Sequence, residues 1–151
     1  MTVAVAIPDF FIPGAPKAGT TSLVGWLAAH PNVGFFCDPK EPQFFQTDFK
    51  LPSRPGGTDA YLALFPPRPA GGLRCEATTG HLISRVAIDA ILPLNPIAKF
   101  IACMRDPVDL FFSLHRQMLK EGYETLADPR ATWEASVVRQ RGERLPKPCP
   151  D

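Results

Sequence analysis

A short segment rich in glycine and hydroxyl side chains is the part of this sequence best suited to chemistry. Residues 14–22 read GAPKAGTTS, with Gly14 and Gly19 five positions apart. This is the glycine spacing of a nucleotide-binding P-loop, in which backbone N–H groups surround a phosphate. A helix beginning near Thr20 would add its free N–H groups and its dipole to an anion site. The alternative is a glycine-rich turn that only caps a helix; the strand–loop–helix context favours the anion site.

The cations near this segment differ in position from those of a P-loop that binds ATP with magnesium. Thr20 stands where a P-loop has its lysine, and Lys17 comes three positions earlier. A P-loop NTPase also holds Mg²⁺ partly through an aspartate that follows another strand. Here the strand expected over residues 98–104 is followed by Arg105, a cation. Lys17 and Arg105 therefore favour an anion that binds without a metal ion.

Alternating strand and helix patterns surround the glycine-rich segment and should position it. The apolar run at residues 9–13 predicts a buried strand, and residues 21–30 predict a helix that Pro31 ends. Further strands are expected over residues 33–36, 73–77 and 98–104. This order is typical of an α/β domain with a central parallel sheet, in which ligands bind beyond the carboxyl ends of the strands.

Two more helices are predicted, one from an apolar stripe and one from capping signals. The stripe has helical spacing and consists of Ile83, Val86, Ala87, Ala90, Ile91 and Leu94. The second helix should begin at Asp106-Pro107, an N-cap carboxylate followed by proline, and end near Gly122. Its buried face is expected to consist of Val108, Phe111, Phe112 and Leu119.

The composition is that of an ordinary globular protein and excludes several classes. The chain has 151 residues, of which 45% are hydrophobic and 21% charged, and its formal net charge is +1. The length predicts a single domain over residues 1–151. The balanced charge argues against a nucleic-acid partner and a membrane surface, and the apolar runs are too short to span a membrane.

Cysteine placement and the N-terminal sequence favour a cytoplasmic protein. The four cysteines lie far apart and form no CxxC pair, so we expect reduced thiols and neither a disulfide framework nor a zinc site. The first residues, MTVAVAIPDFF, lack the basic start and the cleavage site of a signal peptide. Seven of the 18 prolines fall between Pro39 and Pro69, which predicts a long loop over residues 37–70, and loops of this length are usually functional or disordered.

Four segments together resemble a known enzyme family. PKAGTTSL at residues 16–23 is similar to the 5′-phosphosulfate-binding loop of sulfotransferases that use 3′-phosphoadenosine 5′-phosphosulfate (PAPS), above all the heparan-sulfate-type and related bacterial enzymes. Three segments follow in the family's order: KEPQFF at 40–45, YLALFP at 61–66 and AKFIACMRDPVDLFFSLHRQ at 98–117. The resemblance covers residues 10 to 125 and implies a P-loop-like three-layer α/β domain around a central parallel sheet.

The resemblance also implies roles for individual residues. The phosphosulfate would be held by Lys17, Ala18, Gly19, Thr20, Thr21 and Ser22. Lys17 matches the lysine that stabilises charge on the bridging oxygen of PAPS. Glu41 matches the carboxylate that takes the acceptor's proton. Arg105 and Ser113 match the residues that hold the 3′-phosphate, for which a guanidinium is well suited.

Each of these roles has an alternative that the residues alone leave open. The family often has a histidine two residues after the glutamate, whereas this chain has Gln43, so the orientation of the base is open. Outside the resemblance the same side chains are ordinary surface groups: Glu41 beside a proline turn, Arg105 in a salt bridge to Asp106 or Asp109, and Ser113 on a helix surface.

Aromatic and histidine side chains complete the candidate list. His81 follows the strand at 73–77 and is the alternative base or a substrate contact. His30 is expected at a helix end and His115 in a packed helix, while Phe44 and Phe45 should pack the long loop onto the domain. Trp26 and Trp133 are expected to serve packing and not to bind adenine.

The function implied is transfer of a sulfuryl group from PAPS, without a metal, to a hydroxyl or amine acceptor in a small molecule or carbohydrate. Members of the family usually continue well beyond this length, and the resemblance fades after Glu124. We therefore expect a partial domain, truncated at the C-terminus, with a poorly matched tail at residues 125–151. The alternatives are a P-loop-like kinase or NTPase that needs Mg²⁺, and an inactive remnant that binds PAP, the desulfated product.

Overall fold

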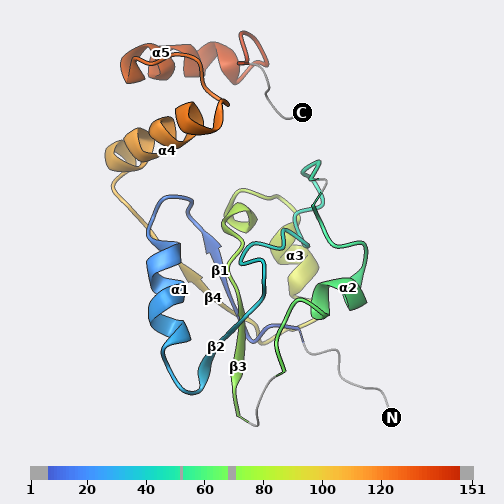
Figure 1. Cartoon of the computed structure of the whole chain (residues 1–151). Coiled ribbons are helices and arrows are strands. Elements are labelled where there is room, and N and C mark those ends of the chain that lie inside the picture. Colours follow the sequence, from blue (N-terminus) through green and yellow to red (C-terminus); the bar gives the residue numbers. More distant parts are fainter. Residues whose placement is uncertain (1–6, 52, 68–70, 147–151) are drawn as a thin grey trace. The chain divides into compact units, whose positions relative to one another are not determined.

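The computed structural model describes residues 7–51, 53–67 and 71–146, and its central feature is a four-stranded parallel sheet (Figure 1). The strands are β1 (Phe10–Gly14), β2 (Val33–Phe36), β3 (Leu73–Glu76) and β4 (Lys99–Ala102). They lie in the order β2-β3-β1-β4, and each neighbouring pair is parallel. The predicted α/β class and parallel sheet are confirmed. All four carboxyl ends therefore meet at one edge, where such sheets bind ligands.

The two faces of the sheet bury separate apolar clusters because successive strand residues point to opposite faces. Along β1, Phe10 and Ile12 pack on the face covered by α1 (Thr20–Ala28). Phe11 faces the other way, toward the cluster that includes Tyr61 and Ile91. The elements on that side are α2 (Thr58–Leu62), the 3₁₀ turn η1 (Thr79–Leu82) and α3 (Ala87–Ile91).

The long apolar stripe predicted between Ile83 and Leu94 is wrong as a single helical face. The helix α3 is only five residues long, and Ile83 and Leu94 are 65% and 49% exposed. Ser84 explains the late start, because its hydroxyl accepts hydrogen bonds from two backbone N–H groups that begin α3. Pro93 lacks the N–H group that a longer helix would use.

Residues 105–151 form a second compact unit, which is described by itself. Its first helix, α4 (Pro107–Glu121), has the predicted limits. The Asp106 carboxylate accepts hydrogen bonds from two N–H groups of the first turn, and Gly122 ends the helix with a φ of 80°. Local capping signals therefore define this helix.

A further helix, α5 (Pro129–Arg139), lies in the tail for which no structure is predicted. It begins with the same signal as α4, since the carboxylate of Asp128 accepts a hydrogen bond from an N–H of its first turn. Glu124, just before α5, forms an ion pair with Arg139 at its end. The bidentate contact to Arg139 lowers the pKa of Glu124 to about 2.

The face that α4 buries differs from the predicted one. Val108 and Phe112 are 62% and 44% exposed, whereas Phe111 is half-buried. Phe111 packs edge-on against Trp133 of α5, with ring centroids 5.2 Å apart, and stacks on His115. His115 is buried as predicted, with its Nε2 2.8 Å from a backbone oxygen. The neighbouring helix, absent from the prediction, decides which side of α4 is covered.

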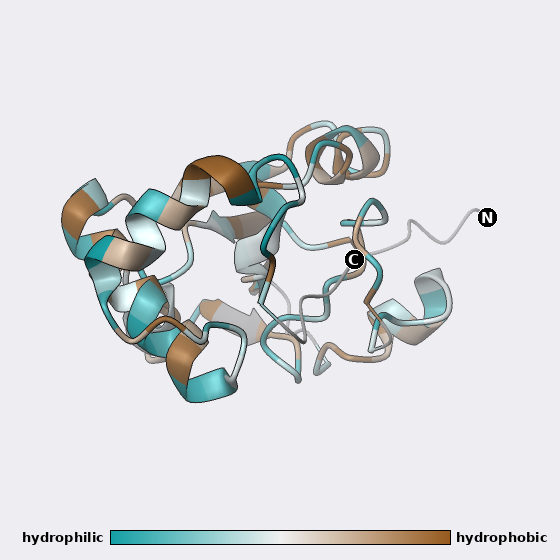
Figure 2. Ribbon diagram, turned by 90° about the horizontal axis from the view of Figure 1, so that it is seen from above, coloured by the Kyte–Doolittle hydropathy of each residue, from teal (hydrophilic) through white to brown (hydrophobic). Residues whose placement is uncertain are grey.

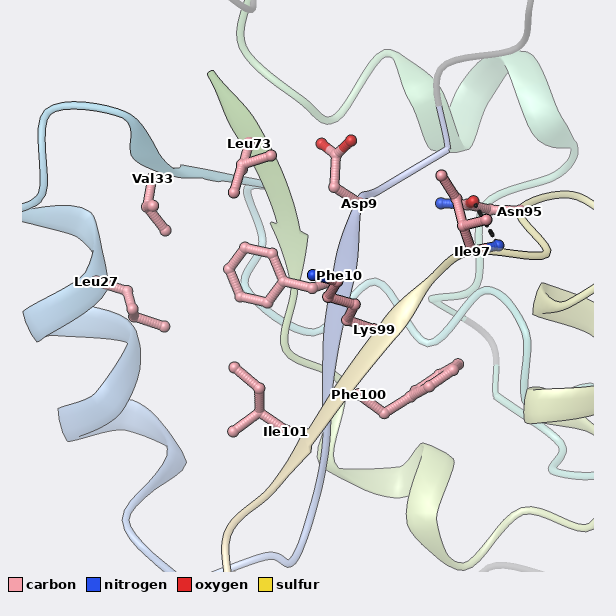
Figure 3. A pocket seen from close by; sticks show the side chains of 10 residues that line it. All are labelled: Asp9, Phe10, Leu27, Val33, Leu73, Asn95, Ile97, Lys99, Phe100 and Ile101. Atoms are coloured by element: carbon pink, nitrogen blue, oxygen red, sulfur yellow. Dashed lines mark hydrogen bonds between the residues drawn. The ribbon is translucent and has the colours of Figure 1, made fainter. Parts of the chain in front are cut away.

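The strand β4 forms an edge of the sheet and lines an apolar hollow of about 560 Å³ (Figure 3). On the α1 side of this hollow, the side chains of Leu27, Phe10 and Ile101 point toward one another. Ile101 is 41% exposed and Ile97, just before β4, is 84% exposed. This edge therefore presents apolar side chains beside a strand that pairs with β1 on one side only, within the part of the chain that the structure describes.

The remaining expectations concern thiols and helices. Cys37 and Cys75 are free and buried, burial raises the pKa values of both thiols, and Cys103 is free as well. Cys149 and residues 1–6 lie outside the described residues.

The helices mix hydrophilic and hydrophobic residues (Figure 2), and among the described ones none is long and apolar enough to cross a membrane.

The proline-rich loop is anchored by aromatic side chains, as predicted. Phe45 is buried to 3% exposure, with ring contacts to Phe11 and Tyr61 at centroid distances of 6.0 and 5.2 Å. Phe44 stacks on the Tyr61 ring, with ring centroids 4.5 Å apart, and also contacts the ring of Phe45. These contacts hold the residues around position 41 against the sheet.

We expect Phe45→Ala to destabilise the protein by about 3–5 kcal/mol, because it removes a buried aromatic ring and leaves a cavity. Urea denaturation followed by circular dichroism measures the loss. Trp26→Ala is the matched control, since Trp26 is 75% exposed on α1 and should change stability by about 0.5 kcal/mol or less. Equal losses in the two variants would contradict the anchoring of the loop.

Candidate active site

The glycine-rich loop leaves the carboxyl end of β1 and enters α1 directly. Lys17 and Gly19 have φ values of 61° and 89°, in the left-handed region that turns the chain into the helix at Thr20. At Gly14, where φ is 147°, a Cβ atom would lie 2.8 Å from the backbone oxygen of Thr79. Glycine is therefore required where β1 passes η1, and the loop starts in contact with that turn.

The N-terminus of α1 is not capped by any described side chain. Its N-cap is Gly19, and its first turn holds no acidic residue. By contrast, α4 and α5 are each capped by an aspartate. The first N–H groups of a helix lack intrahelical acceptors and carry the positive end of the dipole. This helix start is therefore suited to an external anion, with the Thr21 and Ser22 hydroxyls exposed beside it.

Glu41 is fixed beside this helix start by contacts to both carboxylate oxygens. Oε2 accepts hydrogen bonds from the hydroxyl and the backbone N–H of Thr79, at 2.9 and 3.3 Å. Oε1 lies 3.1 Å from Nζ of Lys40. The side chain is 34% exposed, so one side of the carboxylate stays open. The orientation of the carboxylate, which the sequence leaves open because of Gln43, thus comes from Thr79 and Lys40.

Lys40 links Glu41 to the glycine-rich loop. Its Nζ donates hydrogen bonds to the hydroxyls of Thr20 and Thr21, at 3.4 and 3.5 Å. The loop and the carboxylate, separated by about 20 residues in sequence, are thereby brought to one place at the carboxyl edge of the sheet. The sequence pattern predicts no role for Lys40 or Thr79, although Lys40 stands next to Glu41 in the KEPQFF segment.

A buried polar cluster lies near Glu41, at the end of β3. The hydroxyl of Tyr61 donates a hydrogen bond to Glu76, and His81 Nε2 lies 3.4 Å from the other oxygen of this carboxylate. Burial, together with the charge of Glu41, raises the pKa of Glu76 to about 7, although the hydrogen bonds from Thr78 and Tyr61 act to lower it. Burial also lowers the pKa of His81 to about 4. A neutral His81 makes no ion pair with Glu76, and the 3.4 Å contact between Nε2 and the carboxylate oxygen is not a hydrogen bond.

His81 is the predicted alternative base, and its position favours Glu41 for this role. Its side chain is fully buried, with the rings of Phe11 and Phe45 around it at centroid distances of 6.4 and 5.9 Å. A general base must come within hydrogen-bond reach of the acceptor's hydroxyl. Glu41 is open to solvent and His81 is not, so the geometry favours the carboxylate.

Arg105 and Ser113 belong to the second unit. Arg105 is exposed just before α4, and Ser113 is half-buried within that helix. The Asp106 carboxylate, one alternative partner of Arg105, accepts hydrogen bonds from the start of α4. Their assignment to a 3′-phosphate stays a prediction.

Comparison with known proteins gives a consistent family of relatives, although no protein-family model matches the chain. Human heparan sulfate glucosamine 3-O-sulfotransferase 6 is 30% identical over 114 residues, which are 76% of this chain and 31% of that protein. Mouse bifunctional heparan sulfate N-deacetylase/N-sulfotransferase 3 is 26% identical over 89% of this chain and 17% of its own length. The chain therefore spans a third or less of these curated relatives.

A solved structure shows the same fold. The sulfotransferase from Alicyclobacillus acidocaldarius superposes with a TM-score of 0.80 and 30% sequence identity, covering 91% of this chain and 60% of that protein. The predicted resemblance and the predicted fold are both confirmed by these comparisons.

We expect Glu76→Gln to flatten one part of the pH dependence of stability. A pKa raised from 4.5 to about 7 by burial stabilises the fold below pH 4.5, and this stabilisation is lost as pH rises through 7. The amide of the variant cannot ionise. The free energy of unfolding of the variant relative to the wild type should therefore be at least about 1 kcal/mol higher at pH 8 than at pH 5. Urea denaturation at both pH values measures the difference.

The comparison at equal pH removes the opposite contribution of His81, whose lowered pKa costs stability as pH falls from 6.5 toward 4. Glu143→Gln, at an exposed position, is the control and should show no such change. If the free energies of unfolding of Glu76→Gln and Glu143→Gln depend on pH in the same way, the pKa of Glu76 is not raised in the folded protein, which contradicts the effect of burial.

Proposed function

This chain belongs to the sulfotransferase family, and we propose that it holds the donor site of an enzyme that transfers a sulfuryl group from PAPS to a hydroxyl or amine. The observation that carries the proposal is the juxtaposition of two features. The uncapped start of α1 is suited to an anion, and Glu41 is held beside it by Lys40 and Thr79. An anion site next to an oriented carboxylate is what sulfuryl transfer to a hydroxyl requires.

The donor would bind through the loop between β1 and α1. The backbone N–H groups at the start of α1 and the hydroxyls of Thr20, Thr21 and Ser22 would hold the phosphosulfate. Lys17 would stabilise the negative charge that develops on the bridging oxygen as the sulfuryl group leaves. Arg105 and Ser113 would hold the 3′-phosphate, which distinguishes PAPS from ordinary adenine nucleotides.

In the transfer step, the acceptor's oxygen forms a bond to sulfur while the bond between sulfur and the bridging phosphate oxygen breaks. The acceptor's proton passes to Glu41, and PAP leaves with the electron pair of the broken bond. The protein contributes chiefly position and charge, as in phosphoryl transfer. The names of the relatives place carbohydrate among the acceptors, and we propose the same class for this chain.

A phosphotransferase that uses ATP is the weaker alternative. Thr20 occupies the position of the P-loop lysine, and the named relatives are sulfotransferases. An inactive protein that binds PAP without transferring sulfate is separated from an active one by the second of the two experiments below.

Calorimetry without metal should show that PAP binds about tenfold or more tightly than AMP, because PAP carries the additional 3′-phosphate. Arg105→Ala should weaken PAP binding by about 1.5–3 kcal/mol and leave AMP binding nearly unchanged. Arg116→Ala, another exposed arginine of the same unit, is the control. Equal affinity for PAP and AMP, or ATP binding that depends on Mg²⁺, would overturn the proposed donor.

Glu41→Gln should lower the rate of sulfate transfer by about 10²–10⁴-fold, because the amide cannot take the acceptor's proton. The affinity for PAP should stay within about twofold, since Glu41 does not belong to the anion site. Release of PAP from PAPS, with desulfated heparan sulfate as acceptor, measures the rate.

The control for this experiment is Glu121→Gln, an exposed glutamate at the end of α4. Transfer by Glu41→Gln at the wild-type rate would place the base elsewhere. A wild-type protein that binds PAP and transfers sulfate to no hydroxyl or amine acceptor would be the inactive form.

A further inference from the structure

Lys40 occupies a position between the two halves of the proposed site. Its Nζ lies 3.1 Å from Oε1 of Glu41, and 3.4 and 3.5 Å from the hydroxyls of Thr20 and Thr21. The side chain is only 27% exposed. An ammonium group has three N–H donors, and among the described residues these three oxygens are the acceptors that it contacts.

Two of these acceptors are weaker partners than an anion would be. The hydroxyls of Thr20 and Thr21 are neutral, and their distances from Nζ are at the long end of hydrogen bonding. Charged oxygens accept shorter and stronger hydrogen bonds from an ammonium than hydroxyls do. An anion bound at the start of α1 would therefore draw the ammonium away from the two hydroxyls, while the contact to Glu41 persists.

The contact to Glu41 also shows which end of the donor Lys40 would meet. The oxygen that loses its proton to Glu41 is the oxygen that bonds to sulfur, so the carboxylate must face the sulfuryl group. An ammonium one hydrogen bond away from this carboxylate lies on the same side. Lys17, on the loop itself, is left to act on the bridging oxygen.

We propose that Lys40 binds the sulfuryl group that is transferred and positions Glu41 against it, so that the site distinguishes PAPS from its product PAP. The inference rests on the proposed function. Lys40 keeps its proton throughout the reaction, and it acts as a fixed charge between the sulfonate oxygens and the carboxylate. Loss of the sulfuryl group removes the sulfonate oxygens that Lys40 binds on the donor, which weakens the binding of PAP and favours product release.

The test compares the affinities of PAPS and PAP, measured by calorimetry without acceptor. Lys40→Met keeps the aliphatic stem and removes the charge. It should weaken PAPS binding about tenfold or more and change PAP binding less than about threefold. A general structural defect would weaken both ligands alike. Lys40→Arg restores the positive charge and should recover most of the preference for PAPS, while Lys120→Met, an exposed lysine of α4, should leave both affinities unchanged.

Turnover supplies a second readout. With PAPS and desulfated heparan sulfate, Lys40→Met should raise KM for PAPS and also lower kcat, because Glu41 loses the partner of one oxygen. Thermal melting shows whether the variant folds. If the variant does not fold, the wild type still provides a test, because equal affinities of the wild type for PAPS and PAP would overturn the inference.

The outcomes separate this inference from the proposed function. A wild type that binds neither PAPS nor PAP defeats both. A wild type that prefers PAPS, together with a Lys40→Met variant that keeps the same preference, defeats the role of Lys40 and leaves the proposed function standing.

Discussion

The parallel pairing of β1 with β3 is the constraint on which the first unit's candidate site depends. It places the end of β1, from which the glycine-rich loop leaves, beside the end of β3, from which Thr79 follows. Thr79 then binds Glu41, and Lys40 joins this carboxylate to the first residues of α1. An antiparallel partner would deliver these segments to opposite edges, so the chemistry is a consequence of strand direction.

Those parts of the fold that local signals control could be predicted from the sequence. The limits of α4 follow from an aspartate and a proline at one end and a glycine at the other, and the structure keeps them. The stripe between Ile83 and Leu94 has the right spacing, but only its middle, at Ala87 and Ile91, is buried, and Ser84 delays the helix. Periodicity predicts a face without saying whether another element covers it.

Only part of the candidate site could be predicted from the sequence. The loop and Glu41 could be recognised from their resemblance to a family, and the structure brings them together. Lys40 and Thr79 could not, because their importance arises from contacts across 20 and 38 positions of the chain. The burial of Glu76 and His81 is likewise a tertiary effect, since a charged residue and a histidine after a short strand look like surface groups in the sequence.

The close approach at Gly14 ties the backbone of one segment to the chemistry of another. Thr79 touches position 14 with its carbonyl oxygen and holds Glu41 with its hydroxyl and N–H group. A β-carbon at position 14 would displace the turn at Thr79 and, with it, the carboxylate of Glu41, although position 14 and Glu41 are linked only through Thr79. Position 14 is therefore restricted to glycine by its contact with the turn that also orients Glu41, the proposed base.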